Sequence, residues 1–141
     1  MQYLKDYLDY AVLGVLGAMS FLMLALVIER YLYMARVDLG RFSDPEDLNL
    51  ALTHHLTEIA TIGSNAPYVG LLGTVLGILV SFHDMGQGGA IETGTIMLGL
   101  ALALKATALG LVVAIPSIVF YNGLLRRVEV LQAGWRRLNR P

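Results

Sequence analysis

The chain has 141 residues, of which 56% are hydrophobic and 15% are charged, and its formal net charge is −1. Soluble domains usually carry about 25% charged residues, so this chain is poor in charge. A near-neutral chain gives no reason to expect a nucleic-acid partner, and the absence of cysteine excludes disulfides, thiolate nucleophiles and zinc–thiolate sites. Residues 11–28, 59–82 and 93–125 contain one charged residue between them, Lys105, which indicates a small membrane protein with an aqueous face.

The three apolar stretches predict an all-α protein that crosses the membrane three times. A bilayer crossing needs about 20 apolar residues. We therefore expect a single membrane domain over residues 1–141, with spans at about 11–28, 62–82 and 94–122 and helices that extend into the cytoplasm.

The flanks of the spans predict their orientation, because cytoplasmic flanks are enriched in Lys and Arg. With the N-terminus outside, eight basic residues fall in the cytoplasm and one, Lys5, falls outside. The predicted topology is N-out and C-in, with cytoplasmic residues 29–61 and 123–141 and an external turn at 83–92. No small-residue cleavage site directly follows the first stretch, so we expect a retained span and not a cleaved signal peptide.

Residues 43–59 carry the signals of a separate amphipathic helix. Ser43, Asp44 and Pro45 are residue types that begin helices. An apolar stripe follows at helical spacing, formed by Leu48, Leu52, Leu56 and Ile59. We expect this helix to run directly into the second span, and either to lie at the membrane interface or to contact another subunit.

Small residues predict which spans pack closely, because helices associate in lipid where their backbones can approach. The second and third spans are rich in them, notably Gly70, Gly73, Gly77, Gly99, Ala103 and Gly110. We expect these two spans to pack tightly and the bulkier first span to face lipid. Pro67 and Pro116 are expected to bend their helices.

Thr74 and Thr107 place hydroxyl groups in the hydrocarbon region, where each needs a hydrogen-bond partner. A threonine in a helix commonly bonds the carbonyl one turn earlier, and spacing alone favours that interpretation. The alternative is a polar lining for a pathway shared by the second and third spans.

Lys105 lies roughly 18 Å of helix from the start of its apolar stretch. A lysine at mid-bilayer costs about 2.5–3.5 kcal/mol on insertion scales, so it should be paired, neutral or beside water. The spans contain no Asp or Glu, so an acidic partner in the bilayer would belong to another chain. We interpret Lys105 as a contact to a partner or neighbouring subunit, against the alternative of a side chain that reaches the interface without a role. Lys105 and Thr107 lie about 200° apart on a helix, so they face different surfaces.

The sequence has none of the arrangements typical of an enzyme, such as a nucleophile–base pair or a cofactor fingerprint. His54, His55 and His83 lack ligand partners at metal-binding spacing. We therefore expect no catalytic residue, no cofactor and no metal site.

Two long motifs resemble the MotA/TolQ/ExbB proton-channel family. The first is GSNAPYVGLLGTVLGI over residues 63–78, and the second is ATALGLVVAIP over residues 106–116, followed by Tyr121 and Asn122. The short form of the ExbB branch fits best. The resemblance is close over residues 59–125, whereas the first 58 residues match in layout only.

This resemblance implies an ExbB-like subunit of a homopentamer, embedded in the bilayer of the bacterial inner membrane. The pentamer would enclose single-span ExbD-like partners that carry a membrane Asp, and would use the proton-motive force to energise a TonB-like protein. The resemblance also implies that Thr74 and Thr107 face the central pore, which reverses the preference drawn from spacing. The alternatives are a TolQ-like or flagellar-type stator, or a membrane scaffold with no ion pathway.

The third span departs from the family pattern at one position. Many family members have Glu-Ala-Leu-x-Ala-Thr, where this chain has LALKAT from Leu102 to Thr107. The acid is replaced by Leu102, and Lys105 lies about 60° from it around the helix. We therefore expect proton transfer to depend on the partner's Asp and the two threonines, without a carboxylate from this chain.

Overall fold

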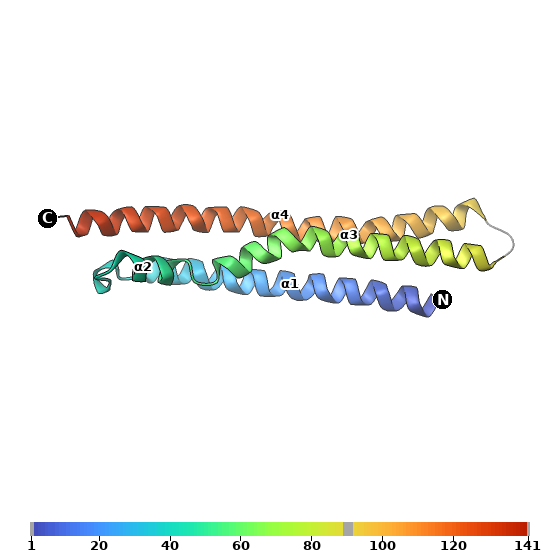
Figure 1. Ribbon diagram of the computed structural model, residues 1–141, viewed down its shortest axis with the longest axis horizontal. Coiled ribbons are helices and arrows are strands. Elements are labelled where there is room, and N and C mark those ends of the chain that lie inside the picture. The colour runs from blue at the N-terminus through green and yellow to red at the C-terminus, as the bar shows by residue number, and fades with distance from the viewer. Residues whose placement is uncertain (1, 89–91, 141) are drawn as a thin grey trace.

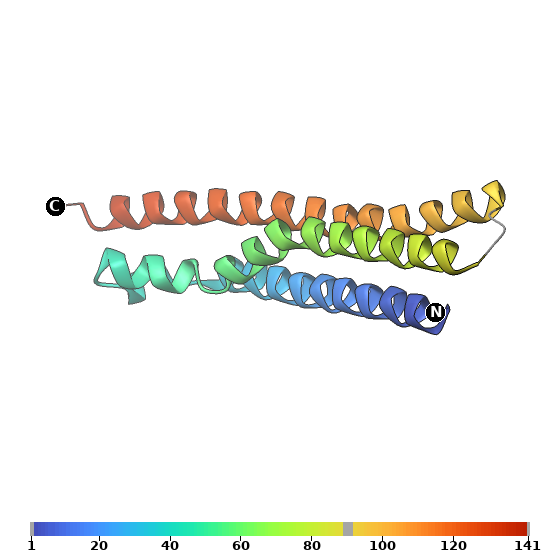
Figure 2. The ribbon, with the colours of Figure 1, turned by 45° about the vertical axis from the view of Figure 1, so that its right-hand side comes forward.

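The computed structural model describes residues 2–88 and 92–140. In chain order its elements are α1 (Gln2–Arg36), the 3-10 helix η1 (Leu39–Arg41), α2 (Pro45–Leu52), α3 (Leu56–Gln87) and α4 (Thr93–Leu138). Three of these helices, α1, α3 and α4, are long and apolar enough to cross a membrane, which confirms the expected all-α class. Figures 1 and 2 show an elongated bundle, with the start of α1 at one end and the C-terminus of α4 at the other.

The helices are longer than a membrane crossing requires, α4 most of all. Its 46 residues extend about 69 Å, whereas the hydrocarbon core of a bilayer is about 30 Å thick. Beyond the part that α3 covers, α4 continues beside α2 and the end of α1 (Figure 1). Part of α4 must therefore lie outside the hydrocarbon core of a bilayer.

The most extensive helix contact is between α3 and α4, as their small residues predict, and α1 packs less extensively against both. One apolar core runs along the bundle, and its largest fully buried side chains are Met23, Leu48, Leu52, Ile59 and Leu124. The helix α3 remains continuous through Pro67, and α4 remains continuous through Pro116. In its first half α3 passes from beside α1 to beside α4 (Figure 2).

The structure has α2 begin where the sequence predicts a helix start. The Asp44 carboxylate accepts the Glu46 N–H at 2.9 Å, and Pro45 is the first helical residue. The apolar stripe is at most 3% exposed, and it packs against α1 and α4 of its own chain. The stripe is therefore used inside the protomer, where the long ends of α1 and α4 cover it, and any contact of α2 with the membrane or with another subunit would have to use its other faces.

A turn at residues 53–55 separates α2 from α3, so the amphipathic helix does not run directly into the second span. The carbonyl of Asn49 accepts both the N–H of Thr53, at 2.9 Å, and its hydroxyl, at 2.7 Å, which ends α2. His55 then has a φ of 69°, in the left-handed region, and α3 begins at the next residue.

Two hydrogen bonds fasten the end of α4 to this region. The indole N–H of Trp135 donates to the carbonyl of Phe42 at 2.9 Å, and the amide of Gln132 donates to the Asn49 side-chain oxygen at 2.7 Å. They hold the loop before α2, and α2 itself, against α4.

The expected external turn at residues 83–92 is partly helical. Residues 83–87 form the end of α3, where the Gly88 N–H donates to the Asp84 carbonyl at 3.2 Å. Ser81, Asp84 and Met85 line a cavity shared with α1 and α4. Residues 89–91 lie outside the described residues, and α4 begins at Thr93.

Candidate functional site

The backbones of α3 and α4 approach closely where two glycines face each other. A Cβ added to Gly70 would lie 2.6 Å from the carbonyl oxygen of Ala106 and 3.1 Å from the Cα of Gly110. A Cβ added to Gly110 would lie 2.6 Å from the carbonyl oxygen of Ala66. Because both obstacles are backbone atoms, only glycine fits at this crossing.

The same contact continues toward the start of α4. A Cβ on Gly77 would meet that of Ala103 at 3.2 Å, and a Cβ on Gly99 would meet the Ser81 hydroxyl at 3.1 Å. The facing surfaces of α3 and α4 contain all the small residues predicted to pack, namely Gly70, Gly73, Gly77, Gly99, Ala103 and Gly110.

Thr74 and Thr107 meet about one helical turn from the glycine crossing. The Oγ1 atoms of the two residues are within hydrogen-bond distance of each other. The Thr74 hydroxyl is also 2.8 Å from the carbonyl oxygen of Ala103, across the interface, and 3.3 Å from that of Gly70, in its own helix. Thr74 therefore does bond back to its own helix, but its shorter bonds are to α4. The structure brings the two threonines of the predicted pathway together.

Lys105 lies on the opposite side of α4 from the contact with α3. It is exposed, whereas Ala103 is 4% exposed. A separation of two residues turns a side chain about 200° around the helix axis. Leu98 and Val112, seven residues before and after Lys105, are exposed on the same side of the helix. Lys105 therefore does not share a surface with Thr107.

A polar contact between α1 and α3 lies beside the first turns of α4, before Lys105. The Lys5 ammonium donates to the Ser81 hydroxyl at 3.4 Å and lies beside Gly99. Gly99 is six residues, or about 9 Å of helix, from Lys105, and side chains on a helix lean toward its N-terminus. Lys105 itself lies roughly 18 Å of helix from Thr93, as the sequence predicts, because α4 is continuous from that residue.

Leu102, at the position where the family resemblance expects an acid, lines the cavity at the Lys5 end of the bundle. The carboxylates lining this cavity come from other positions, namely Asp6, Asp9, Asp84 and Glu92. The departure at Leu102 thus leaves an apolar side chain in the third turn of α4, while the acidic groups of the cavity come from other segments.

Arg30 is a buried charge that sequence reasoning used only to set the orientation. It is 2% exposed, and its Nη1 donates to the carbonyls of Ala51, at 2.8 Å, and Leu52, at 3.5 Å, at the end of α2. The rest of its guanidinium pairs with the Glu29 carboxylate at 2.5 Å. A signal was present in the sequence, because Arg30 shares one helical stripe with the buried side chains of Met23, Val27 and Met34.

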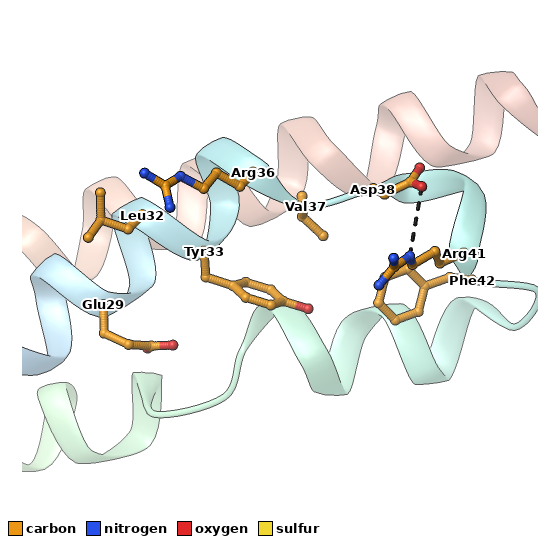
Figure 3. A pocket seen from close by; sticks show the side chains of 8 residues that line it. All are labelled: Glu29, Leu32, Tyr33, Arg36, Val37, Asp38, Arg41 and Phe42. Carbon is orange, nitrogen blue, oxygen red and sulfur yellow. Dashed lines mark ion pairs between the residues drawn. The ribbon is translucent and has the colours of Figure 1, made fainter.

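A pocket adjoins Arg30 at the end of α1, between that helix and the loop that follows it (Figure 3). Tyr33 lines the pocket, and its ring centre lies 4.4 Å from the Arg30 guanidinium carbon. Arg41 and Asp38, also in the lining, form an exposed ion pair at 3.9 Å. The lining contains none of the residues predicted for the pathway, so the pocket is a feature of the α1–α2 junction.

Comparison of the sequence with known proteins identifies the family of the chain. The family model described as the MotA/TolQ/ExbB proton channel family matches residues 44–137. The biopolymer transport protein ExbB of Helicobacter pylori strain J99 is 57% identical over 96% of this chain and 94% of its own length. The ExbB of Aquifex aeolicus is 50% identical over 99% of this chain and 94% of its own length. The Tol-Pal system protein TolQ of Pseudomonas aeruginosa is 47% identical over 52% of this chain and 32% of its own length.

The matches to ExbB proteins extend over nearly the whole of both chains, and the family match includes α2, α3 and almost all of α4. With its three long apolar helices, the chain is therefore a multi-pass membrane protein of short ExbB type that belongs to the MotA/TolQ/ExbB proton channel family.

Proposed function

We propose that the chain is the proton-channel subunit of an inner-membrane complex that uses the proton-motive force to energise TonB-dependent uptake through the outer membrane. Similarity to ExbB proteins over nearly the whole chain supports TonB-dependent uptake as the process that the complex energises. The similarity to TolQ covers about half of the chain and a third of that protein. It therefore supports a role in a Tol-Pal system less strongly than the ExbB similarity supports a TonB system.

In this proposal the subunit forms a homopentamer around single-span ExbD-like partners. The eight basic residues that flank the spans on the α2 side support an N-out, C-in orientation. The Lys5 end of the bundle then faces the periplasm, and α2 and the C-terminal part of α4 lie in the cytoplasm.

The hydrogen-bonded pair of Thr74 and Thr107 carries the proposal of an ion pathway. The pair lies near the middle of the two apolar stretches, beside the glycine crossing, where side chains that served only for packing would need no hydroxyl. The chain has no acid within its apolar stretches, so a membrane Asp of the ExbD-like partner would carry the proton past these hydroxyls.

We further infer that Lys105 contacts an acidic group of a partner chain. Its position opposite the α3 contact directs it away from the core of its own bundle. A second copy of this chain has no acid in the apolar stretches to offer, so the acid would come from a different subunit or from the hydrated end of the bundle.

The test is co-expression with the neighbouring genes, native mass spectrometry of the purified complex, and proton flux after reconstitution into liposomes. The mass spectrum identifies the single-span partner and its stoichiometry, which separates a TonB load from a Tol load. We expect the double variant Thr74→Val, Thr107→Val to assemble and to lose proton flux. Unchanged flux in that variant would instead mean that the pathway lies elsewhere, and absence of flux from the wild-type complex would identify a scaffold.

A further inference from the structure

Charge is segregated between two segments at the α2 end of the bundle. Residues 42–58 contain four acidic residues and no Lys or Arg, whereas residues 126–140 contain five Arg and one Glu. The helix α2 and the C-terminal part of α4 lie side by side (Figure 1). Among the residues that the structure describes, neither Glu46 of α2 nor Arg137 of α4 has an ion-pair partner, so these opposite charges do not meet within the chain.

The outward face of α2 carries an acid and an exposed leucine. Leu48 is 1% exposed and faces the core, and Glu46 and Leu50 each lie two residues from it, about 160–200° around the helix. Leu50 is 69% exposed, and with Glu46 it lines a hollow on the outer side of α2. The core of the protomer leaves this leucine uncovered.

The outward face of α4 carries an arginine and an exposed valine. Val128 is 4% exposed, whereas Val130, two residues later, points about 200° away from it and is 47% exposed. Arg137 follows Val130 by seven residues, or about two turns, so it lies on the same side of the helix. Val130 and Arg137 line one hollow on this face.

The order of the hydrogen bonds between these helices fixes the levels of their side chains along the bundle. Gln132 bonds the Asn49 side chain. Trp135, further along α4, bonds the carbonyl of Phe42, which precedes α2. The α2 region therefore runs antiparallel to α4, with Asn49 and Gln132 at one common level.

From that common level, the rise of about 1.5 Å per residue gives the height of each outward side chain. Leu50 lies about 1.5 Å and Val130 about 3 Å toward the apolar spans. Glu46 lies about 4.5 Å and Arg137 about 7.5 Å in the opposite direction. Copies in one membrane share an orientation, so a closed ring of them keeps every residue at its own height. The leucine of one copy is then nearly level with the valine of the next, and the acid with the arginine.

We propose that the outward face of α2 docks on the outward face of the C-terminal part of α4 in a neighbouring copy of the chain, with Leu50 packed on Val130 and Glu46 paired with Arg137. The occupant is a second copy because the two faces match in charge and in height. Within one protomer the faces point away from their shared contact, so the docking is head-to-tail, the arrangement that closes a ring. The inference rests on the homo-oligomer of the proposed function and deepens it, because it names surfaces that join the copies.

The chain contains no cysteine, so cysteines introduced in pairs test this contact directly. In the complete complex, we expect the double variant Leu50→Cys, Val130→Cys to form disulfides between copies under mild oxidation. The linked chains should form a ladder whose largest member equals the copy number found by native mass spectrometry. Each single variant should stay unlinked, because a head-to-tail contact does not bring two copies of one residue together.

Charge exchange tests the ion pair separately. Adding Glu46→Arg to the double-cysteine variant should slow disulfide formation about two- to fivefold, the range expected for an exposed ion pair. Adding Arg137→Glu as well should restore the rate, although the change at the start of α2 remains. The difference should disappear in 1 M salt, where the Debye length is about 3 Å.

A complex that contains several copies but yields no linked chains from the double-cysteine variant would overturn the inference. Linked dimers from either single variant would also overturn it, as would an exchanged pair that reacts as slowly as Glu46→Arg alone. A wild-type complex that contains a single copy of the chain would refute the proposed homopentamer itself, and this inference with it.

Discussion

Substituting Gly70 with alanine tests whether the α3–α4 crossing depends on backbone proximity. The new Cβ would lie 2.6 Å from the Ala106 carbonyl oxygen, and an ordinary contact begins at 3.4 Å. The helices would have to move apart by roughly 0.8 Å at this point, because neither obstacle is a flexible side chain. Such a movement would also pull on the bond between Thr74 and the Ala103 carbonyl.

The expected cost follows from comparison with Gly14→Ala, in the middle of α1. A Cβ at Gly14 would have no atom within 4 Å outside its own helix backbone. Both variants gain about 1 kcal/mol of helix propensity over glycine, so the difference between them isolates the overpacking. Overpacking costs about 1–3 kcal/mol, and we expect the upper part of this range because the obstacle is backbone.

The measurement is equilibrium unfolding of each variant in detergent, followed by circular dichroism. We expect Gly70→Ala and Gly110→Ala each to be about 2–3 kcal/mol less stable than Gly14→Ala. The double variant should cost less than the sum, because helices already separated by one Cβ accommodate the second. Equal stability of Gly70→Ala and Gly14→Ala would refute the close crossing.

Two further predictions concern charged side chains, the buried Arg30 and the exposed Lys105. Arg30→Met should lose about 1.5–3 kcal/mol of stability, because charged hydrogen bonds to the end of α2 are removed, and hydrogen exchange should increase in α2. Arg36→Met, at an exposed position of the same helix, is the control, and equal exchange in both variants would contradict the role of Arg30. Lys105→Met should leave the stability of the isolated chain unchanged and weaken partner retention at least tenfold, which is about 1.4 kcal/mol. Lys105→Arg should retain the partner, and unchanged retention and flux in Lys105→Met would rule out the contact.

Residue patterns predicted the local features of this protein well. The three apolar stretches predict the long helices, and the glycines of the second and third stretches predict which helices pack closely. The start of α2 followed from Asp44 and Pro45, because helix capping depends on residues adjacent in sequence. Spacing alone also placed Lys105 and Thr107 on different faces of one helix, since the helical repeat is regular.

Other features depended on residues far apart in the chain. The stripe on α2 reads equally well as a membrane or subunit surface, and only the ends of α1 and α4 determine that it is buried within the protomer. In the sequence, Arg30 indicates only the orientation of the first span, whereas the structure shows that it binds the end of α2. The contact between Lys5 and Ser81 joins residues 76 positions apart, which no local pattern predicts.

The sequence by itself determined that the chain has three membrane-length helices, and which of their faces carry the small residues that allow close packing. The tertiary structure decided how the polar groups on those helices are paired. The reason is that periodicity is a property of one helix, whereas a hydrogen bond such as that between Thr74 and the Ala103 carbonyl depends on the register of two helices. That register, set by the Gly70–Gly110 crossing, gives Thr74 and Thr107 their different positions.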